Sequence, residues 1–281
     1  MTEIESRVAD HYGTEGLVAR IRDAVAEAGG DPHALTATDL KGVDEFHTGG
    51  LAATEHLLAK LEIGSGTRVL DIGCGIGGTA RHIAGATGAR VLGIDLTPEY
   101  VAAARALSEE VGLGSVLDFE VGSALDLPVA DGAVDLATMF HVGMNISDKP
   151  ALMAEVARCL SPGGTFALYD VMQLGPGDLT FPFPWAEEAG CSFVDPPGAY
   201  RAAAAQAGLE LQNEEPRVDF TRDFFAAAFD YIEAHGAPPP VGIHLLMGAT
   251  GAEKIRNYVA EVDAGRIGPV EMIFRKPQTE T

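Results

Sequence analysis

Residues 69–84 have the sequence VLDIGCGIGGTARHIA, in which an apolar run leads directly into a glycine-rich loop and then into a helical pattern. The run over 68–72 has the length and composition of a buried strand. The glycines that follow allow the backbone to turn tightly and to approach a ligand without a Cβ in the way. The helix then begins with free N–H groups. This strand–loop–helix unit predicts a ligand-binding turn at the edge of a sheet.

The alternation of strand-like and helical segments continues after this unit. Helical patterns near 78–87, 98–111 and 149–160 separate apolar runs, and a further helical pattern covers 200–207. The apolar runs lie at 68–72, 90–96, 116–121, 134–140 and 165–171. This pattern predicts an α/β fold with a mostly parallel sheet and flanking helices. In such sheets the ligand lies outside the carboxyl ends of the strands.

The ends of the chain predict additional helices around this core. We expect residues 1–62 to form an N-terminal helical lid, 63–218 the cofactor-binding core, and 219–281 a helical cap with a terminal strand that completes the core sheet. Phe225, Phe229 and Ile232 recur at helical spacing within the cap. They predict a stripe packed on the core, with a pocket wall as the alternative.

The glycine loop alone is compatible with two classes of ligand. Gly73, Gly75 and Gly78 fit the GxGxxG pattern of dinucleotide-binding proteins, and Asp95 lies at about the right distance downstream to hold a ribose. An NAD(P)-dependent oxidoreductase therefore remains the alternative function.

Four further features occur in chain order around the loop. Asp71 precedes the glycines by two residues, GIDL at 93–96 ends the second strand, GSALDLP occupies 122–128, and LSPGG occupies 160–164. Together they resemble the motif set of S-adenosylmethionine-dependent methyltransferases with a Rossmann-like fold, over roughly 43–170. The resemblance implies a sheet whose last strand is antiparallel. It also implies an enzyme that transfers a methyl group to a small-molecule N, O or C nucleophile by in-line displacement. A regulator that binds the cofactor without catalysis is a third, non-enzymatic possibility.

The resemblance also implies which residues hold the cofactor, S-adenosyl-L-methionine, and its product S-adenosyl-L-homocysteine. Asp71 and the loop backbone would hold the methionine end, and Asp95 would accept both ribose hydroxyls, because a carboxylate can accept two donors at once. Many relatives carry Asp where this sequence has Ser123, beside the adenine edge. Packing or turn roles are the alternatives for Leu96, Ala124 and Asp95. The full implied set is Asp71, Gly73, Cys74, Gly75, Asp95, Leu96, Ser123, Ala124, Thr48 and Phe140.

Two more segments resemble parts of small-molecule methyltransferases. DEFHTGGLAAT at 44–54 resembles the segment that closes over the methionine moiety, and HVGMNI at 141–146 resembles the loop beside the transferred methyl. With Tyr12, they resemble enzymes acting on sarcosine and dimethylglycine, and relatives that methylate quinones, tocopherols and isoprenoids. A hydroxyl or ammonium acceptor must lose a proton, so His141 is the first candidate base and His47 the second, with positioning roles as the alternative. Candidate substrate-binding residues are Tyr12, Asn145, Asp170, Trp185, His244 and Met247.

Composition limits the partners of the chain. Its 281 residues include 41 acidic and 19 basic side chains, a net charge of −22, which argues against nucleic acid and anionic membranes and leaves a small-molecule substrate. A homodimer is left open. The 3 cysteines form no CxxC pair and no HExxH occurs, so we expect no metal. No signal peptide or run of about 18 apolar residues is seen, which favours a cytoplasmic location.

Overall fold

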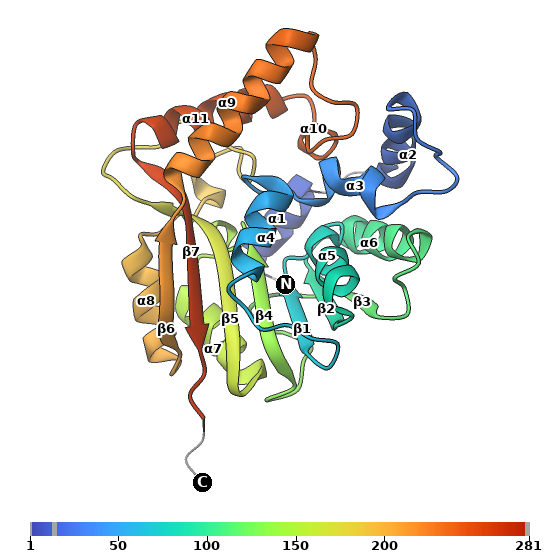
Figure 1. Cartoon of the computed structure of the whole chain (residues 1–281). Helices are drawn as coiled ribbons and strands as arrows, with labels where there is room; N and C mark the ends of the chain where they lie inside the picture. Colours follow the sequence, from blue (N-terminus) through green and yellow to red (C-terminus); the bar gives the residue numbers. More distant parts are fainter. Residues whose placement is uncertain (1, 13–15, 279–281) are drawn as a thin grey trace.

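Seven strands form one sheet in the order β3-β2-β1-β4-β5-β7-β6 in the computed structural model, which describes residues 2–12 and 16–278 (Figure 1). The first five strands in this order are parallel, and β7 is antiparallel to both β5 and β6. The predicted mostly parallel sheet with a last antiparallel strand is therefore confirmed. The strands are β1 (Arg68–Ile72), β2 (Arg90–Asp95), β3 (Leu117–Val121), β4 (Val134–Phe140), β5 (Leu160–Gln173), β6 (Glu210–Pro216) and β7 (Ile267–Arg275).

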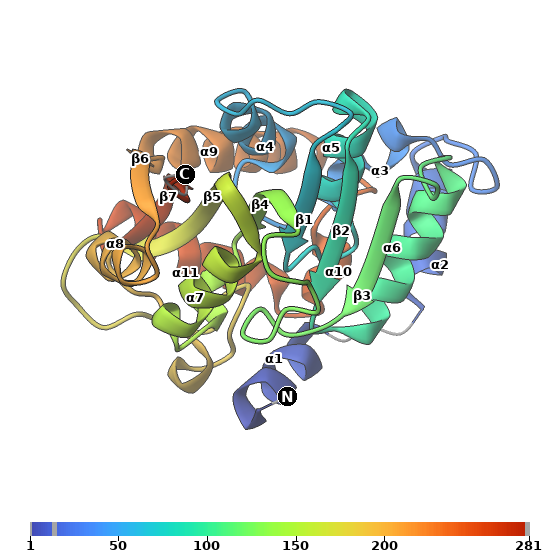
Figure 2. The same cartoon turned by 90° about the horizontal axis from the view of Figure 1, so that it is seen from below.

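Helices cover both faces of this sheet. Apolar residues of α4, α5 and α6 pack on one face, and those of α7 and α8 pack on the other (Figure 2). Successive residues of β1, Val69 and Leu70, belong to the two different cores, as expected when side chains alternate between the faces of a strand. The flanking helices are α4 (Gly50–Leu58), α5 (Gly78–Thr87), α6 (Pro98–Glu110), α7 (Lys149–Cys159) and α8 (Pro197–Gln206).

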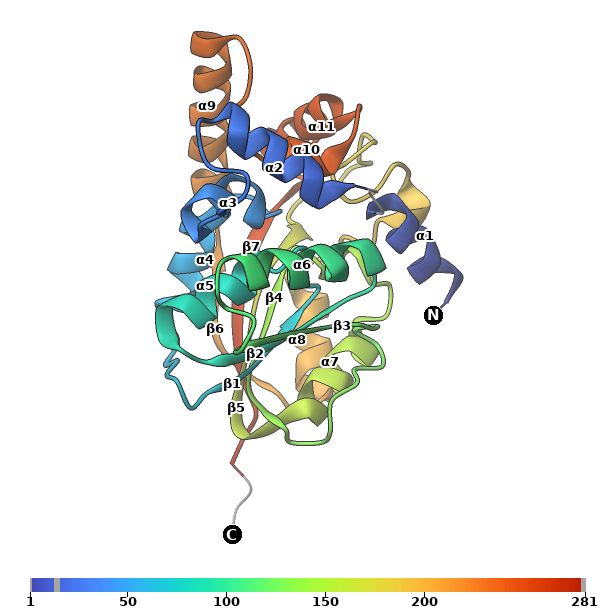
Figure 3. The same cartoon turned by 90° about the vertical axis from the view of Figure 1, so that its right-hand side faces the viewer.

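A second group of helices gathers beyond the carboxyl ends of the parallel strands. Figures 1 and 3 show α2, α3, α9, α10 and α11 together at this end, with the end of β7 at the opposite end. Ile21 and Leu40 of the N-terminal helices pack with Tyr100 and Leu107 of α6, which fixes them to the core. These elements are α1 (Glu3–Tyr12), α2 (Leu17–Glu27), α3 (Ala37–Asp44), α9 (Val218–His235), α10 (His244–Met247) and α11 (Gly251–Asp263), with short 3₁₀ turns at Gly143–Asn145 and Ala189–Cys191.

Within the expected N-terminal helical segment, Thr36 and Asp39 begin α3 with a reciprocal capping box. The stripe predicted on the cap is only partly buried, because Phe225 is 6% exposed whereas Phe229 and Ile232 are 40% and 38% exposed. A core-facing stripe through all three was therefore wrong. No helix within the described residues is long and apolar enough to cross a membrane.

Candidate active site

A cavity of about 390 Å³ lies where β1, β2, β3 and β4 end. Its floor is made by the segments that follow these strands, including the glycine loop and residues 122–125 and 140–148. Its walls come from α1, from residues 44–48 and from side chains of α9, α10 and α11. The cavity thus joins the sheet edge to the helices above it, which is where a doubly wound sheet binds its ligand.

Asp95 fixes the glycine loop at the end of β2. Its Oδ2 accepts the backbone N–H of Gly75 at 2.9 Å, and its Oδ1 accepts the N–H of Thr97 at 2.9 Å. Gly75 has φ +52, a conformation that suits glycine. Burial raises the pKa of Asp95, while the N–H donors from Thr97 and Gly75 oppose that shift. These two hydrogen bonds fix the orientation of the Asp95 carboxylate at the cavity wall.

Asp71, at the end of β1, has a free acceptor in a buried position. Its Oδ1 accepts the hydroxyl of Thr138 at 2.8 Å, whereas its Oδ2 has no hydrogen-bond partner among the described residues. Burial raises the pKa of Asp71 to about 7, and the charges of Glu45 and Asp95 add to the shift. A buried acceptor without a donor is costly, so a ligand group that donates a hydrogen bond is favoured here.

Glu45 joins the N-terminal segment to the core. A single oxygen, Oε2, accepts the ring N–H of His47 at 2.8 Å and the hydroxyls of Thr54 and Thr79, each at 3.0 Å. Although burial opposes ionisation, these donors hold the pKa of Glu45 below its ordinary value. The same segment passes so close to Gly78 that a Cβ there would lie 1.9 Å from a backbone oxygen of the segment. The first residue of α5, Gly78, therefore has to be a glycine.

The two candidate bases differ in what holds their ring nitrogens. His47 is buried, stacks on Phe140 with ring centroids 5.0 Å apart, and binds Glu45 through Nε2. His141 lies 5.8 Å from it, and its Nε2 is buried with no hydrogen-bond partner in the described part of the chain. Burial lowers the pKa of His141 well below 6.5, with His47 adding to the effect. His141 is thus the neutral imidazole with an available nitrogen.

Backbone geometry places His141 at the cavity. It is the non-glycine residue with positive φ (+52) within the described residues, and its N–H donates to the carbonyl of Tyr169 at 2.7 Å. Such strain in a non-glycine residue costs free energy and clusters at functional sites. The bond to β5 holds the ring at the sheet edge.

The substrate residues expected from sequence fall into two groups. Tyr12, Asn145 and Trp185 line the cavity, and the Asn145 amide donates to the Tyr12 hydroxyl at 3.3 Å. Three others are not among the cavity-lining residues of the structure: Asp170, His244 and Met247. Asp170 is fully buried beneath the floor, where it accepts the Tyr200 hydroxyl at 2.6 Å.

The cofactor residues implied by the sequence come together more completely. All of them line the cavity, although they come from four strand ends and the segment before α4: Asp71, Gly73, Cys74, Gly75, Asp95, Leu96, Ser123, Ala124, Thr48 and Phe140.

Sequence reasoning missed several residues of the site. Glu5 of α1 lines the cavity and accepts the hydroxyl of Ser123, 118 residues away. Tyr258 of α11 accepts the hydroxyl of Thr48 at 3.0 Å. Glu45 was quoted only as part of a longer segment. The partners of all three residues are distant in sequence or unremarkable in type, so only the fold reveals them.

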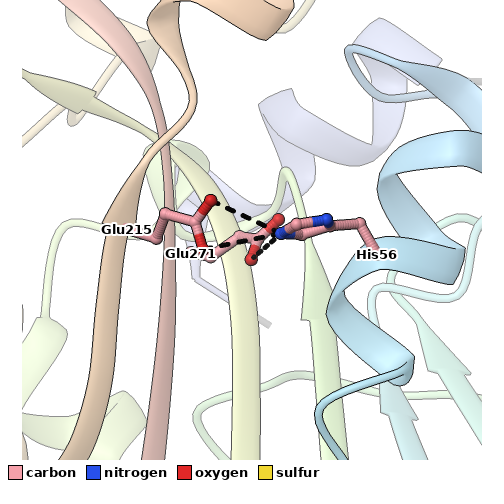
Figure 4. Close-up of side chains that lie close together, drawn as sticks. All are labelled: His56, Glu215 and Glu271. Atoms are coloured by element: carbon pink, nitrogen blue, oxygen red, sulfur yellow. Dashed lines mark hydrogen bonds and ion pairs between the residues drawn. The ribbon is translucent and has the colours of Figure 1, made fainter.

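A second group of titratable residues lies away from the cavity. His56, Glu215 and Glu271, from α4, β6 and β7, place their ligand atoms within 4.8 Å of one another (Figure 4). Lys60 donates to both carboxylates, at 2.6 Å to Glu215, and Arg217 donates to Glu271 at 2.8 Å. The carboxylates are already paired with two cations, so this group is an ion-pair network that ties α4 to the sheet.

Comparison with known protein families decides between the two ligand classes. The family model described as a methyltransferase domain matches residues 70–168. Residues 70–168 form a methyltransferase domain. This domain contains the glycine loop and every strand end on the cavity floor, and the match favours methyl transfer over the oxidoreductase left open by the glycine pattern.

Individual relatives resemble the methyltransferase domain and the fold around it. The methyltransferase GfsG of Streptomyces halstedii is 33% identical over 140 residues, which are 50% of this chain and 50% of that protein. The chain thus aligns with only half the length of this curated relative. Geranyl diphosphate C-methyltransferase from Streptomyces coelicolor A3(2), solved with Mg²⁺, geranyl-S-thiolodiphosphate and S-adenosyl-L-homocysteine, superposes with a TM-score of 0.71, 17% identity and 98% coverage of both chains.

A third similar structure shows that the fold alone does not fix the reaction. The [4+2]-cyclase SpnF superposes with a TM-score of 0.68 and 24% identity over 98% of this chain and 97% of its own. At this identity the likeness shows the fold of the methyltransferase domain and its added helices, and nothing about chemistry.

Proposed function

We propose that the chain is an S-adenosylmethionine-dependent methyltransferase that transfers a methyl group to a small-molecule N, O or C nucleophile. The observation that carries the proposal is the single cavity lined by the residues that the resemblance assigns to the cofactor. The methyltransferase domain match over 70–168 supports it independently.

The residues of the cavity fit this cofactor by their chemistry. The unpartnered Oδ2 of Asp71 suits an ammonium group such as that of a methionine moiety. The oriented carboxylate of Asp95 suits a pair of ribose hydroxyls. When bound, S-adenosylmethionine supplies an activated methyl group on a sulfonium centre.

The protein then has to align the acceptor and exclude water. Residues 1–62 act in this proposal as a lid, because residues 44–48 line the cavity and Glu45 ties them to α4 and α5. Alignment within a closed site supplies most of what an in-line displacement needs. For an acceptor that must lose a proton, the neutral ring of His141 accepts it, and His47 positions the lid through Glu45.

Isothermal calorimetry with S-adenosylhomocysteine tests the proposal. We expect binding in the micromolar range and a loss of at least about tenfold in affinity for Asp95→Ala, since about 1.4 kcal/mol corresponds to tenfold. Asp118→Ala removes an exposed carboxylate of β3 and serves as the matched control with unchanged affinity. Binding of NADH without binding of S-adenosylhomocysteine would overturn the proposal.

A further inference from the structure

We call the walls that α1, the loop before α8 and the cap helices contribute the upper part of the cavity. Apart from Glu5 of α1, which binds Ser123, the side chains of these walls carry no charge, and the ring of Trp185 is buried among them. They include Val8, Trp185, Phe224, Phe225, Ile255 and Tyr258.

No lysine or arginine lines the cavity within residues 2–12 and 16–278. The buried cations nearest in sequence to its walls are already paired with carboxylates. Arg81 pairs with Asp44, Lys149 donates to Asp195 at 3.0 Å, and Lys254 pairs with Glu187 at 2.6 Å. A phosphate or diphosphate group entering this space would lose its hydration without gaining a positive partner, which is costly.

The carboxylates at the wall are also occupied. Asp148 caps α7 by accepting the N–H of Ala151 at 2.9 Å, and Glu5 binds Ser123. Asp44 and Glu45 are paired with Arg81 and His47. Together with Asp71 and Asp95, which the cofactor uses in the proposed function, these account for the acidic lining residues of the described chain. Each of these carboxylates therefore already has a hydrogen-bond partner or a proposed cofactor role, and an ammonium group on the acceptor would have to compete for one of them.

The aromatic side chains of the upper part mostly contact one another. Trp185 stacks on Phe183 with ring centroids 4.6 Å apart and an interplanar angle of 8°, and Tyr258 meets Trp185 edge to face. Phe225 also meets Tyr258 edge to face. Because a cation needs exposed ring faces around it, this packing suits an apolar surface better than an ammonium.

Two buried polar atoms belong to residues of the cavity lining. The Oδ1 of Asn145 and the Nε2 of His141 have no hydrogen-bond partner in the described structure, and both residues line the cavity. They offer an acceptor pair for one hydroxyl or amide donor next to the proposed methyl position.

We propose that the methyl acceptor is an uncharged, predominantly apolar molecule with one hydrogen-bond donor that lies against Asn145 and His141. This inference rests on the proposed function and deepens it. It separates this cavity from that of the diphosphate-binding structural neighbour, which was solved with Mg²⁺.

Competing probes with one shared chain test the inference. Protein saturated with S-adenosylhomocysteine is titrated with geraniol, geranylamine and geranyl diphosphate, the last with and without Mg²⁺, and with 2-naphthol as a second neutral probe. We expect a neutral probe to bind at least about tenfold more tightly than the diphosphate or the amine, a difference of about 1.4 kcal/mol. Preference for the diphosphate or amine, or binding by neither neutral probe, would overturn the inference.

Two substitutions on one helix provide a matched control. Phe224→Asp adds a charge to the cavity wall, and Phe229→Asp adds it to the exposed side of α9. We expect the first substitution to lower the affinity for the neutral probe at least about tenfold and the second to leave that affinity unchanged. Only the first buries a charge against the probe. Equal effects of the two would contradict the assignment. Retained binding of S-adenosylhomocysteine shows that a variant is folded. If the unmodified protein does not bind S-adenosylhomocysteine, the proposed function is refuted instead.

Discussion

Glu45 accepts the ring N–H of His47 at 2.8 Å, and the oxygen that does so also accepts hydroxyl donors from α4 and α5. The segment before α4 is thereby joined to the helix that begins at the glycine loop. The position of the lid and the geometry of the loop are coupled through one buried carboxylate, so changes to that carboxylate should affect both stability and ligand affinity.

We expect Glu45→Gln to lower the free energy of unfolding by about 1.5–3 kcal/mol, because a neutral amide oxygen is a weaker acceptor than a carboxylate for the three buried donors that converge on it. The same variant should lower the affinity for S-adenosylhomocysteine, since the lid segment loses its hydrogen bonds to α5, the helix that follows the glycine loop. Chemical denaturation and calorimetry measure the two effects. Glu55→Gln, an exposed carboxylate on α4, is the control. Equal stability of the two variants would show that the buried cluster does not hold the lid.

The raised pKa of Asp71 predicts a pH dependence with a defined sign. Its pKa is about 7 in the folded protein against an ordinary value of 3.8, so between these two pH values the folded state retains a proton that the unfolded state has released. The contribution of this group to stability is therefore present at low pH and is lost as pH rises towards about 7. The difference in unfolding free energy between Asp71→Asn and the unmodified protein should grow in favour of the variant over this range. A constant difference between pH 4 and pH 7 would contradict the assignment.

Ligand affinity should depend on pH in the opposite direction. The ionised form of Asp71 is the better acceptor for an ammonium group, so affinity for S-adenosylhomocysteine should rise between pH 6 and pH 8, by at most about tenfold per pH unit. Calorimetry across this range measures the effect. Asp71→Asn should give weaker binding and a flat profile, and a profile unchanged by this substitution would exclude Asp71 as the titrating group.

His141→Asn tests the base without disturbing the backbone. Asn tolerates positive φ better than most residues, so the strained position at φ +52 should survive the change. We expect methyl transfer to slow by about 10²-fold for an acceptor that must lose a proton, with the affinity for S-adenosylhomocysteine little changed. Rapid-quench turnover with labelled methyl donor separates the two quantities.

The pH profile of turnover gives a second readout for His141. Burial keeps its pKa well below 6.5, so kcat should hold through the ordinary histidine range and fall only at more acidic pH. His141→Asn should lack that acidic limb. An acidic limb that persists in the variant would assign the base role to another group.

Prediction from sequence succeeded where local chemistry decides structure. The glycines and Asp95 lie at strand ends that the alternating pattern defines, and the parallel arrangement brings strand ends to one edge. It failed where a partner is remote. Asp170 also lies in a strand, but its buried carboxylate accepts the hydroxyl of Tyr200 beneath the cavity floor. Helical spacing made Phe225 and Phe229 equivalent, and only the packing of α11 against α9 distinguishes them.

The ion-pair network around Glu271 should contribute to stability and not to ligand binding. Glu271 is fully buried and is paired with Lys60 and Arg217, so Glu271→Ala leaves these two cations with Glu215 alone and should cost about 3–5 kcal/mol of unfolding free energy. Glu214→Ala breaks the exposed pair with Arg201 and should cost at most about 1 kcal/mol. Denaturant titration compares the two variants, and similar losses in both would show that the buried network adds nothing beyond a surface pair.

Because Lys60 occupies the position between the carboxylates, removing divalent cations with EDTA should leave the melting temperature unchanged. A drop on chelation that is restored by Zn²⁺ would instead identify the His56, Glu215 and Glu271 group as a metal site.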